Sequence, residues 1–452
     1  MGLDSLEGFI QDRMIKYRFP GVSIALLKEG EVVYARGLGF RDLTTSLPAT
    51  PSTNYHVGSV TKAFTSAAIM QLVERGLVSL EDPVNKYVSV VKSDEIRVHH
   101  LLTHTSGIPA LGYAEALIDS YYGLGGEWLP TAKPDDVLTF MAGYQDWFNH
   151  KPGERWFYLN EGYVILGKII EKVSGQSYES YVKLNVLERL GMMKSYFTRD
   201  EYVRDEDKAT PYIVDKEGKH ARVEPLFGVS ADGGLFSNVL DLLKFVSMLI
   251  DRGSYMGVEI LSKESVELME KPHVRLPYDS YVADSYGLGL TIRSNFLGRR
   301  LIGHGGSVLV HTAYIGYVPE SRVGVAVLAN MSGYPLSLIG AYALTCVMGM
   351  DPAKELPYVA VERVYDKLVG SYKGYKGTIR LRVRRLGGIL AIENEDARTS
   401  ELTPLVPDGV AEDHALFMVY TLAGRVPVEF FIEDSGRVRM TYERYELIRA
   451  GD

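Results

Sequence analysis

The sequence predicts an α+β domain followed by a small closed β-barrel. Strand patterns lie at both ends of the first 345 residues, with helical patterns between them. A polar, proline-marked linker follows at residues 351–357, and short alternating strands fill the rest of the chain. Strands at both ends indicate one sheet built from chain ends that meet. We expect one domain over residues 1–355 and a second over residues 356–452.

Each element of the first domain has its own signal. Residues 4–16 predict an amphipathic helix, and residues 22–28 and 31–37 predict a hairpin around a tight Glu29-Gly30 turn. A helix begins near Ser59 and ends at Gly76. Further helices are expected at residues 135–144, 163–174, 242–249 and 337–347, and further strands at residues 286–290, 300–303, 312–318 and 323–329.

Two segments keep alternatives open. Residues 113–131 combine aromatic residues with glycines, which fits either a mobile flap over a cleft or a loop that docks its aromatics. Beyond residue 357, seven or eight short strands without a helix of length suggest a small closed barrel. This barrel either packs on the first domain and mediates assembly or captures a ligand.

Composition and charge limit the classes of function. The chain has 452 residues and a formal net charge of −8, which argues against a nucleic-acid partner. No apolar run is long enough to span a bilayer. Cys346 is the single cysteine, so no internal disulfide can form. The acidic N-terminus does not resemble a signal peptide, so we expect a cytoplasmic protein. The scarcity of glutamine hints at a thermophile.

Ser59 and Lys62 form the first candidate for chemistry. They lie three residues apart at a helix start, so the side chains share one helix face. A hydroxyl, an amine that can take its proton, and the N–H groups of a helix end are the parts of a nucleophilic site. Alone, the pattern favours a capping serine and a surface lysine, and the flanking residues and two distant stretches reverse that preference.

The second candidate stretch holds Tyr158 and Asn160, which flank one residue just before a helix. A phenol can shuttle a proton if a nearby ammonium lowers its pKa, and Lys62 is the candidate ammonium. The third stretch is Gly303-His304-Gly305-Gly306-Ser307, placed before a strand. His304 can exchange a proton or hold the tyrosine, and the Ser307 N–H can join that of Ser59 in an oxyanion hole.

His100 and His104 are four residues apart, which is metal-ligand spacing on a helix. No glutamate completes a zinc motif, so packing or capping roles are expected and no metal or organic cofactor is predicted.

The three stretches, in this order and at these separations, resemble the motifs of the penicillin-recognising serine hydrolases. That group includes class C β-lactamases, DD-peptidases, D-aminopeptidases and esterases. The likeness spans residues 8–345. With the terminal barrel, the layout most resembles the archaeal self-compartmentalising serine peptidases, which have a lipocalin-like domain and assemble as octamers. The resemblance implies a β-lactamase/transpeptidase-like fold, with an antiparallel sheet flanked by helices and an all-helical half.

The resemblance also implies roles for the residues. Ser59 becomes the nucleophile, Lys62 its base, Tyr158 the proton shuttle and His304 the third-motif residue. Asn160 would bind substrate, as would the backbone at Gly305, Gly306 and Ser307.

Three departures from the family pattern change the expected substrate. His304 replaces the lysine of β-lactamases, Gly305 lacks the usual hydroxyl, and Leu159 replaces a small polar residue. A substrate carboxylate then has a poorer anchor. We therefore expect a serine peptidase for short peptides, including peptides with D-residues, that works as a homo-oligomer. An esterase or β-lactamase-like hydrolase with the same residues and a non-catalytic ligand binder are the alternatives.

Overall fold

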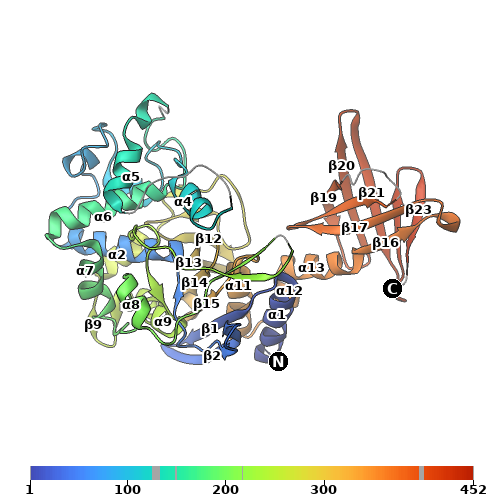
Figure 1. Cartoon of the computed structure of the whole chain (residues 1–452), viewed down its shortest axis with the longest axis horizontal. Helices are drawn as coiled ribbons and strands as arrows, with labels where there is room; N and C mark the ends of the chain where they lie inside the picture. The colour runs from blue at the N-terminus through green and yellow to red at the C-terminus, as the bar shows by residue number, and fades with distance from the viewer. Residues whose placement is uncertain (1, 125–132, 148–149, 216, 396–401, 451–452) are drawn as a thin grey trace. The chain divides into compact units, whose positions relative to one another are not determined.

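The computed structural model describes residues 2–124, 133–147, 150–215, 217–395 and 402–450. The chain divides into two compact units, Met1–Met350 and Asp351–Asp452, which are described separately. Figure 1 shows the elements of both units.

One large antiparallel sheet is the centre of the first unit. Among the described residues, nine strands form it in the order β10-β11-β12-β13-β14-β15-β1-β2-β3. β1 pairs with β15 from Val22↔Ala329 to Lys28↔Val323, so the predicted meeting of the two chain ends is confirmed. The strands are β1 (Gly21–Lys28), β2 (Glu31–Asp42), β3 (Leu47–Pro48), β10 (Val274–Arg275), β11 (Ser285–Tyr286), β12 (Thr291–Phe296), β13 (Arg299–Ser307), β14 (Thr312–Val318) and β15 (Val323–Ala329).

Helices cover both faces of this sheet. A Cβ on Gly324 would meet Val246 of α9 (Val239–Ile250), whereas Val325 approaches Gly340 of α11 (Leu336–Val347). Successive residues of a strand point to opposite faces, so α9 and α11 lie on opposite sides of β15. This double cover explains why every residue of β15 is buried. On the α11 side, Phe9 of α1 (Gly2–Tyr17) stacks on Tyr342.

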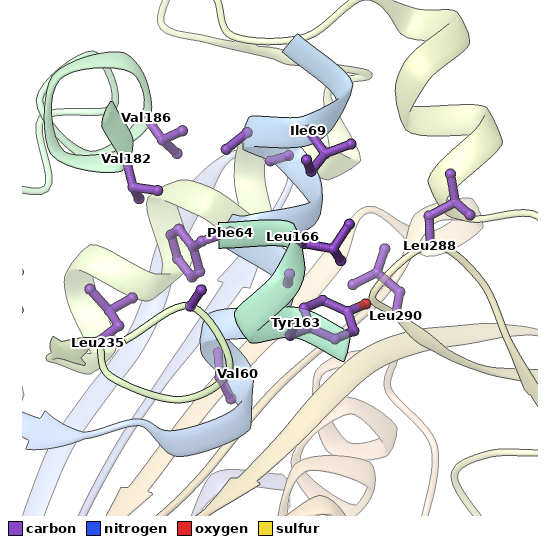
Figure 2. Close-up of a cluster of buried hydrophobic side chains, with 14 of the residues drawn as sticks. Val60, Phe64, Ile69, Tyr163, Leu166, Val182, Val186, Leu235, Leu288 and Leu290 are labelled. Atoms are coloured by element: carbon purple, nitrogen blue, oxygen red, sulfur yellow. The ribbon is translucent and has the colours of Figure 1, made fainter. Parts of the chain in front are cut away.

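The helical half is built around α2 (Thr61–Glu74), in which Thr61 to Leu72 are all buried. Figure 2 shows Phe64 and Ile69 of α2 among side chains from other elements, including Tyr163 and Leu166 of α6 (Asn160–Ser174). A helix that is buried all round is held rigidly by its neighbours. The remaining described α-helices of the first unit are α3 (Val98–Leu102), α4 (Tyr113–Tyr121), α5 (Pro134–Met141), α7 (Tyr178–Val182), α8 (Arg199–Arg204) and α10 (Lys263–Met269).

Two local predictions for the first unit are wrong. Residues 287–290 form a turn and not a strand, because Gly287 N–H donates to Leu290 O and Gly289 has a φ of 74°. The flap or loop expected at residues 113–131 begins as the helix α4, since residues 113–121 have helix-forming side chains after Gly112. Residues 125–131 of that prediction lie outside the described residues.

The second unit contains a closed barrel, as predicted. Its eight described strands are β16 (Gly370–Lys373), β17 (Arg380–Leu386), β18 (Ile389–Asn394), β19 (Leu402–Val410), β20 (His414–Thr421), β21 (Gly424–Ile432), β22 (Val438–Tyr442) and β23 (Tyr445–Arg449). Pairing of β16 with β23 closes the ring. Side chains such as Phe417, Phe430 and Met440 fill its interior, which disfavours the capture of a ligand inside the barrel.

The prediction of a polar linker at residues 351–357 is wrong. α12 (Pro352–Glu355) and α13 (Pro357–Leu368) occupy this region, and both begin with a proline at the first helical position. A proline is tolerated there because the N–H that it lacks has no partner within the helix. α13 also corrects the expectation that the second unit contains no long helix. Its Leu368 packs in the barrel core. Within the described residues of the whole chain, none of the helices has the length and apolarity needed to cross a bilayer.

Candidate active site

The three predicted stretches meet at one cavity of about 500 Å³ in the first unit. The predicted site residues that line it are Ser59, Tyr158, Asn160, His304, Gly305, Gly306 and Ser307. Lys62 lies just beneath this surface and contacts Ser59. The structure thus brings together residues that are separated by up to 248 positions (from Ser59 to Ser307) in the chain.

Ser59 lies in a short 3-10 helix, Gly58–Val60, that leads into α2. Gly58 has a φ of 52°, and a Cβ there would lie 2.9 Å from the Ser307 backbone nitrogen. Only glycine therefore fits between this turn and the end of β13. The Thr61 hydroxyl donates to Gly58 O at 2.7 Å and accepts from Leu235 N–H at 3.1 Å. These contacts hold the serine backbone in place from two sides.

The Lys62 ammonium group is completely buried and makes three short contacts. Its Nζ lies 3.1 Å from Ser59 Oγ, 2.8 Å from Asn160 Oδ1 and 2.6 Å from the backbone oxygen of Asp232. The rings of Tyr158 and Tyr163 lie 4.9 and 5.4 Å from Nζ. This lysine is therefore desolvated beside an aromatic wall.

Burial lowers the pKa of Lys62 to about 8, although the carboxylates of Asp232 and Glu161 oppose this change. The two carbonyl partners can only accept hydrogen bonds. A neutral amine can donate to both carbonyls and direct its lone pair at the Ser59 hydroxyl. The geometry therefore supports a base for the serine that is partly neutral near neutral pH.

The Tyr158 phenol does not have the lowered pKa that the sequence suggested. Burial raises its pKa above the usual range, a hydrogen bond with Ser59 partly offsets this, and Asp232 raises it further. The expectation that the phenol pKa is lowered is wrong, because loss of solvent is the largest influence on this buried side chain. Tyr158 is a neutral phenol that can donate its own proton while it accepts another.

Both ring nitrogens of His304 are occupied. Nδ1 lies 2.6 Å from Gly305 O, and Nε2 lies 2.8 Å from the Tyr286 hydroxyl. A carbonyl can only accept, so Nδ1 carries the proton and Tyr286 donates to Nε2. Burial and the charge of Lys62 lower the histidine pKa to about 4, so the ring is neutral. The Tyr158 and His304 ring centroids are 6.3 Å apart.

The glycines of the third stretch lie at the end of strand β13, and strand β14 follows at Thr312, as predicted. A Cβ on Gly306 would lie 2.0 Å from Val57 O and 3.0 Å from Ser59 N, so only glycine allows this approach. The approach sets the end of β13 against the turn that carries Ser59. A Cβ on Gly305 would meet only Ala313 O, at 4.0 Å.

Several site residues were not predicted from the sequence. Tyr286 fixes His304, and Asp232, Tyr113 and Glu115 line the cavity. No short pattern around Asp232 indicates that its backbone oxygen contacts Lys62. Tyr113 and Glu115 lie in the segment that was expected to be a flap or a loop.

The two histidines with metal-ligand spacing serve the backbone instead. His100 Nδ1 accepts from Arg97 N–H at 3.0 Å, and His104 Nδ1 accepts from Leu159 N–H at 2.9 Å. His104 thereby fixes the segment that carries Tyr158 and Asn160, and its ring lies 4.3 Å from the Tyr158 ring.

Comparisons with known proteins agree with the fold. The Beta-lactamase family model matches residues 6–344, and the Pab87 octamerisation domain model matches residues 352–448. The octameric penicillin-binding protein homologue from Pyrococcus abyssi is 46% identical, with a TM-score of 0.94, over 99% of this chain and 100% of that chain. Penicillin-binding protein 4* from Bacillus subtilis (strain 168) is 28% identical over 80% of this chain and 81% of its own length. D-amino acid amidase from Ochrobactrum anthropi SV3 shares the fold. It is 21% identical, with a TM-score of 0.64, over 76% of this chain and 98% of its own.

Proposed function

The chain belongs to the Beta-lactamase family of serine hydrolases, and on that premise we propose that it is a serine peptidase that cleaves short peptides through an acyl-enzyme on Ser59. The observation that carries this proposal is the hydrogen bond from the buried Lys62 ammonium to Ser59 Oγ, at 3.1 Å. A lysine whose pKa is about 8 is partly neutral at physiological pH and can take the serine proton.

Acylation proceeds in two steps. Neutral Lys62 removes the Ser59 proton while Oγ attacks the substrate carbonyl carbon, which gives a tetrahedral oxyanion. The backbone N–H groups of Ser59 and Ser307 are the proposed donors to this oxyanion. The C–N bond then breaks, and the leaving nitrogen takes the Tyr158 proton while Tyr158 recovers one from Lys62. Water repeats the sequence in reverse and releases the acid.

The other predicted residues position these groups. Asn160 orients Lys62 through its Oδ1, which leaves its amide nitrogen for the substrate. His304 stiffens the end of β13 through its bonds to Gly305 and Tyr286. We assign neither of them a proton-transfer step, because the polar atoms that would take part are already occupied.

Peptides are preferred over penicillins because the cavity offers a poor anchor for a carboxylate. The described residues that line it include no lysine or arginine, and Gly305 supplies no hydroxyl. Apolar side chains, among them Leu117, Ile118 and Phe227, supply a surface for an apolar substrate residue. The name of the D-amino acid amidase that shares the fold refers to D-residues, so the substrate panel should include them.

The second unit supports a homo-oligomer. Its match to an octamerisation domain and the octameric Pyrococcus abyssi homologue lead us to propose an octamer. Assembly is then the role of the barrel, whose interior is filled by its own side chains.

The test is a fluorophosphonate probe followed by peptide mapping, with hydrolysis of p-nitroanilides and p-nitrophenyl esters measured in parallel. We expect a label on Ser59, turnover of anilides, and loss of both in Ser59→Ala. Turnover of esters alone would make the protein an esterase. Absence of both label and turnover would favour a ligand-binding protein.

A further inference from the structure

One wall of the cavity is acidic. Asp232 and Glu115 line it, and the described lining residues include no basic side chain other than histidine. The third acid nearby is Glu161, which is buried behind α4 and lies 3.5 Å from the Tyr113 backbone nitrogen. The Lys62 ammonium beneath the cavity offsets one of these negative charges, and the acidic wall favours a cationic group over an anionic one beside it.

The Asp232 carboxylate is incompletely satisfied. The residue is 8% exposed, and its Oδ2 accepts a hydrogen bond from the Tyr113 hydroxyl at 2.7 Å. Oδ1 is buried and has no hydrogen-bond partner among the described residues. Lys62 does not supply the missing donor, because its three N–H groups point at Ser59, Asn160 and the backbone oxygen of Asp232. A buried carboxylate oxygen without a donor is costly, so a donor from a bound ligand would stabilise it.

The backbone of Asp232 lies close to the reacting atom. Ser59 Oγ and the Asp232 backbone oxygen lie within about 6 Å of each other, since Lys62 Nζ is 3.1 Å from one and 2.6 Å from the other. In an amino acid, the α-nitrogen is about 2.5 Å from the carbonyl carbon. The α-nitrogen of a residue attached to Ser59 therefore lies in the same part of the cavity as Asp232, which lines its wall.

We propose that Asp232 binds the free α-ammonium group of the residue whose carbonyl Ser59 attacks. The substrates are then peptides or amides that begin with that residue, and the enzyme removes one N-terminal residue at a time. An ammonium bound there supplies the donor that Oδ1 lacks, and exposed Glu115 adds attraction from the cavity wall. This inference rests on the proposed role of Ser59.

The experiment compares three p-nitroanilides at pH 7, each prepared from both enantiomers where the compound is chiral. They are phenylalanine p-nitroanilide, its N-acetyl derivative, and 3-phenylpropionyl p-nitroanilide, which lacks the amine. We expect wild-type kcat/KM for the free amine to exceed that for the compound without an amine by a factor on the order of 30. Asp232→Asn should reduce this ratio by a similar factor. Glu224→Gln, which removes an exposed carboxylate that does not line the cavity, should leave the ratio unchanged.

Each result decides the matter. If wild type prefers the compounds without a free amine, the inference is overturned, even if Asp232→Asn fails to fold. If Asp232→Asn slows all three substrates by one factor, Asp232 acts only as a counter-charge for Lys62, and the inference is again overturned. In both cases a fluorophosphonate label on Ser59 leaves the proposed function intact. No label and no turnover would overturn both.

Discussion

The charge state of Lys62 should control acylation, and pH is the most direct perturbation of it. With a pKa of about 8, roughly 10% of the lysine is neutral at pH 7 and 1% at pH 6. Because the base acts only when neutral, kcat/KM for an anilide should rise about tenfold from pH 6 to pH 7 and level off above pH 8. The assay is initial-rate kinetics on a substrate without ionisable groups, combined with the rate of fluorophosphonate labelling.

Two variants separate Lys62 from other groups that titrate nearby. Lys62→Arg keeps the positive charge but cannot be deprotonated, so acylation should fall by about 10² to 10⁴-fold at every pH. Glu161→Gln is the matched control, because burial raises the pKa of Glu161 to about 7 and this group titrates in the same range. The rise of kcat/KM toward pH 8 should persist in Glu161→Gln. A flat profile in wild type between pH 6 and pH 9, or full activity in Lys62→Arg, would refute the assignment.

Four further changes test other parts of the site and the barrel. Tyr158→Phe removes the proton donor, so single-turnover measurements should show a loss of about 10² to 10⁴-fold for anilides and a smaller loss for nitrophenyl esters, whose leaving group needs no proton. Gly305→Thr restores a hydroxyl where a Cβ has space, so labelling by a fluorescent penicillin should increase; equal labelling would show that the hydroxyl is not what limits binding. Gly306→Val places a Cβ against Val57 O and should lower the free energy of unfolding by about 1–3 kcal/mol in denaturant titrations; an unchanged midpoint would contradict the close approach of β13. Leu422→Asp adds a charge to a fully exposed turn between β20 and β21. If that turn lies in a subunit contact, light scattering should report a smaller assembly. Val203→Asp, at an exposed position of the first unit, is the control.

Much of the architecture follows from local patterns. The Glu29-Gly30 turn and its flanking alternation are enough to specify the β1–β2 hairpin, and alternation likewise specifies most of the barrel strands. The spacing of Ser59 and Lys62 is equally local, because residues three apart on a helix are neighbours. These are the features that the sequence predicted correctly.

Other features depend on tertiary contacts that no short pattern contains. Tyr286 meets His304 because β11 and β13 both pair with β12, and that pairing is visible only in the folded sheet. The pKa of Tyr158 rises because the surrounding chain removes water from it, which a list of neighbouring charges could not indicate. Pro352 and Pro357 were interpreted as linker residues, although proline fits the start of a helix equally well.

The base Lys62 lies on α2, a helix that is packed on every side, and the nucleophile Ser59 lies in the short 3-10 helix that leads into it. Any substitution along α2 that alters this packing also shifts Ser59 or Lys62, so few changes there are compatible with both folding and turnover. New substrate preferences must therefore evolve elsewhere, on surfaces that touch the substrate but not the core. The half-exposed side chains of α4, including Leu117 and Ile118, are such a surface. The catalytic residues therefore tolerate few substitutions around them, whereas substitutions along α4 can change the substrate preference without disturbing the core.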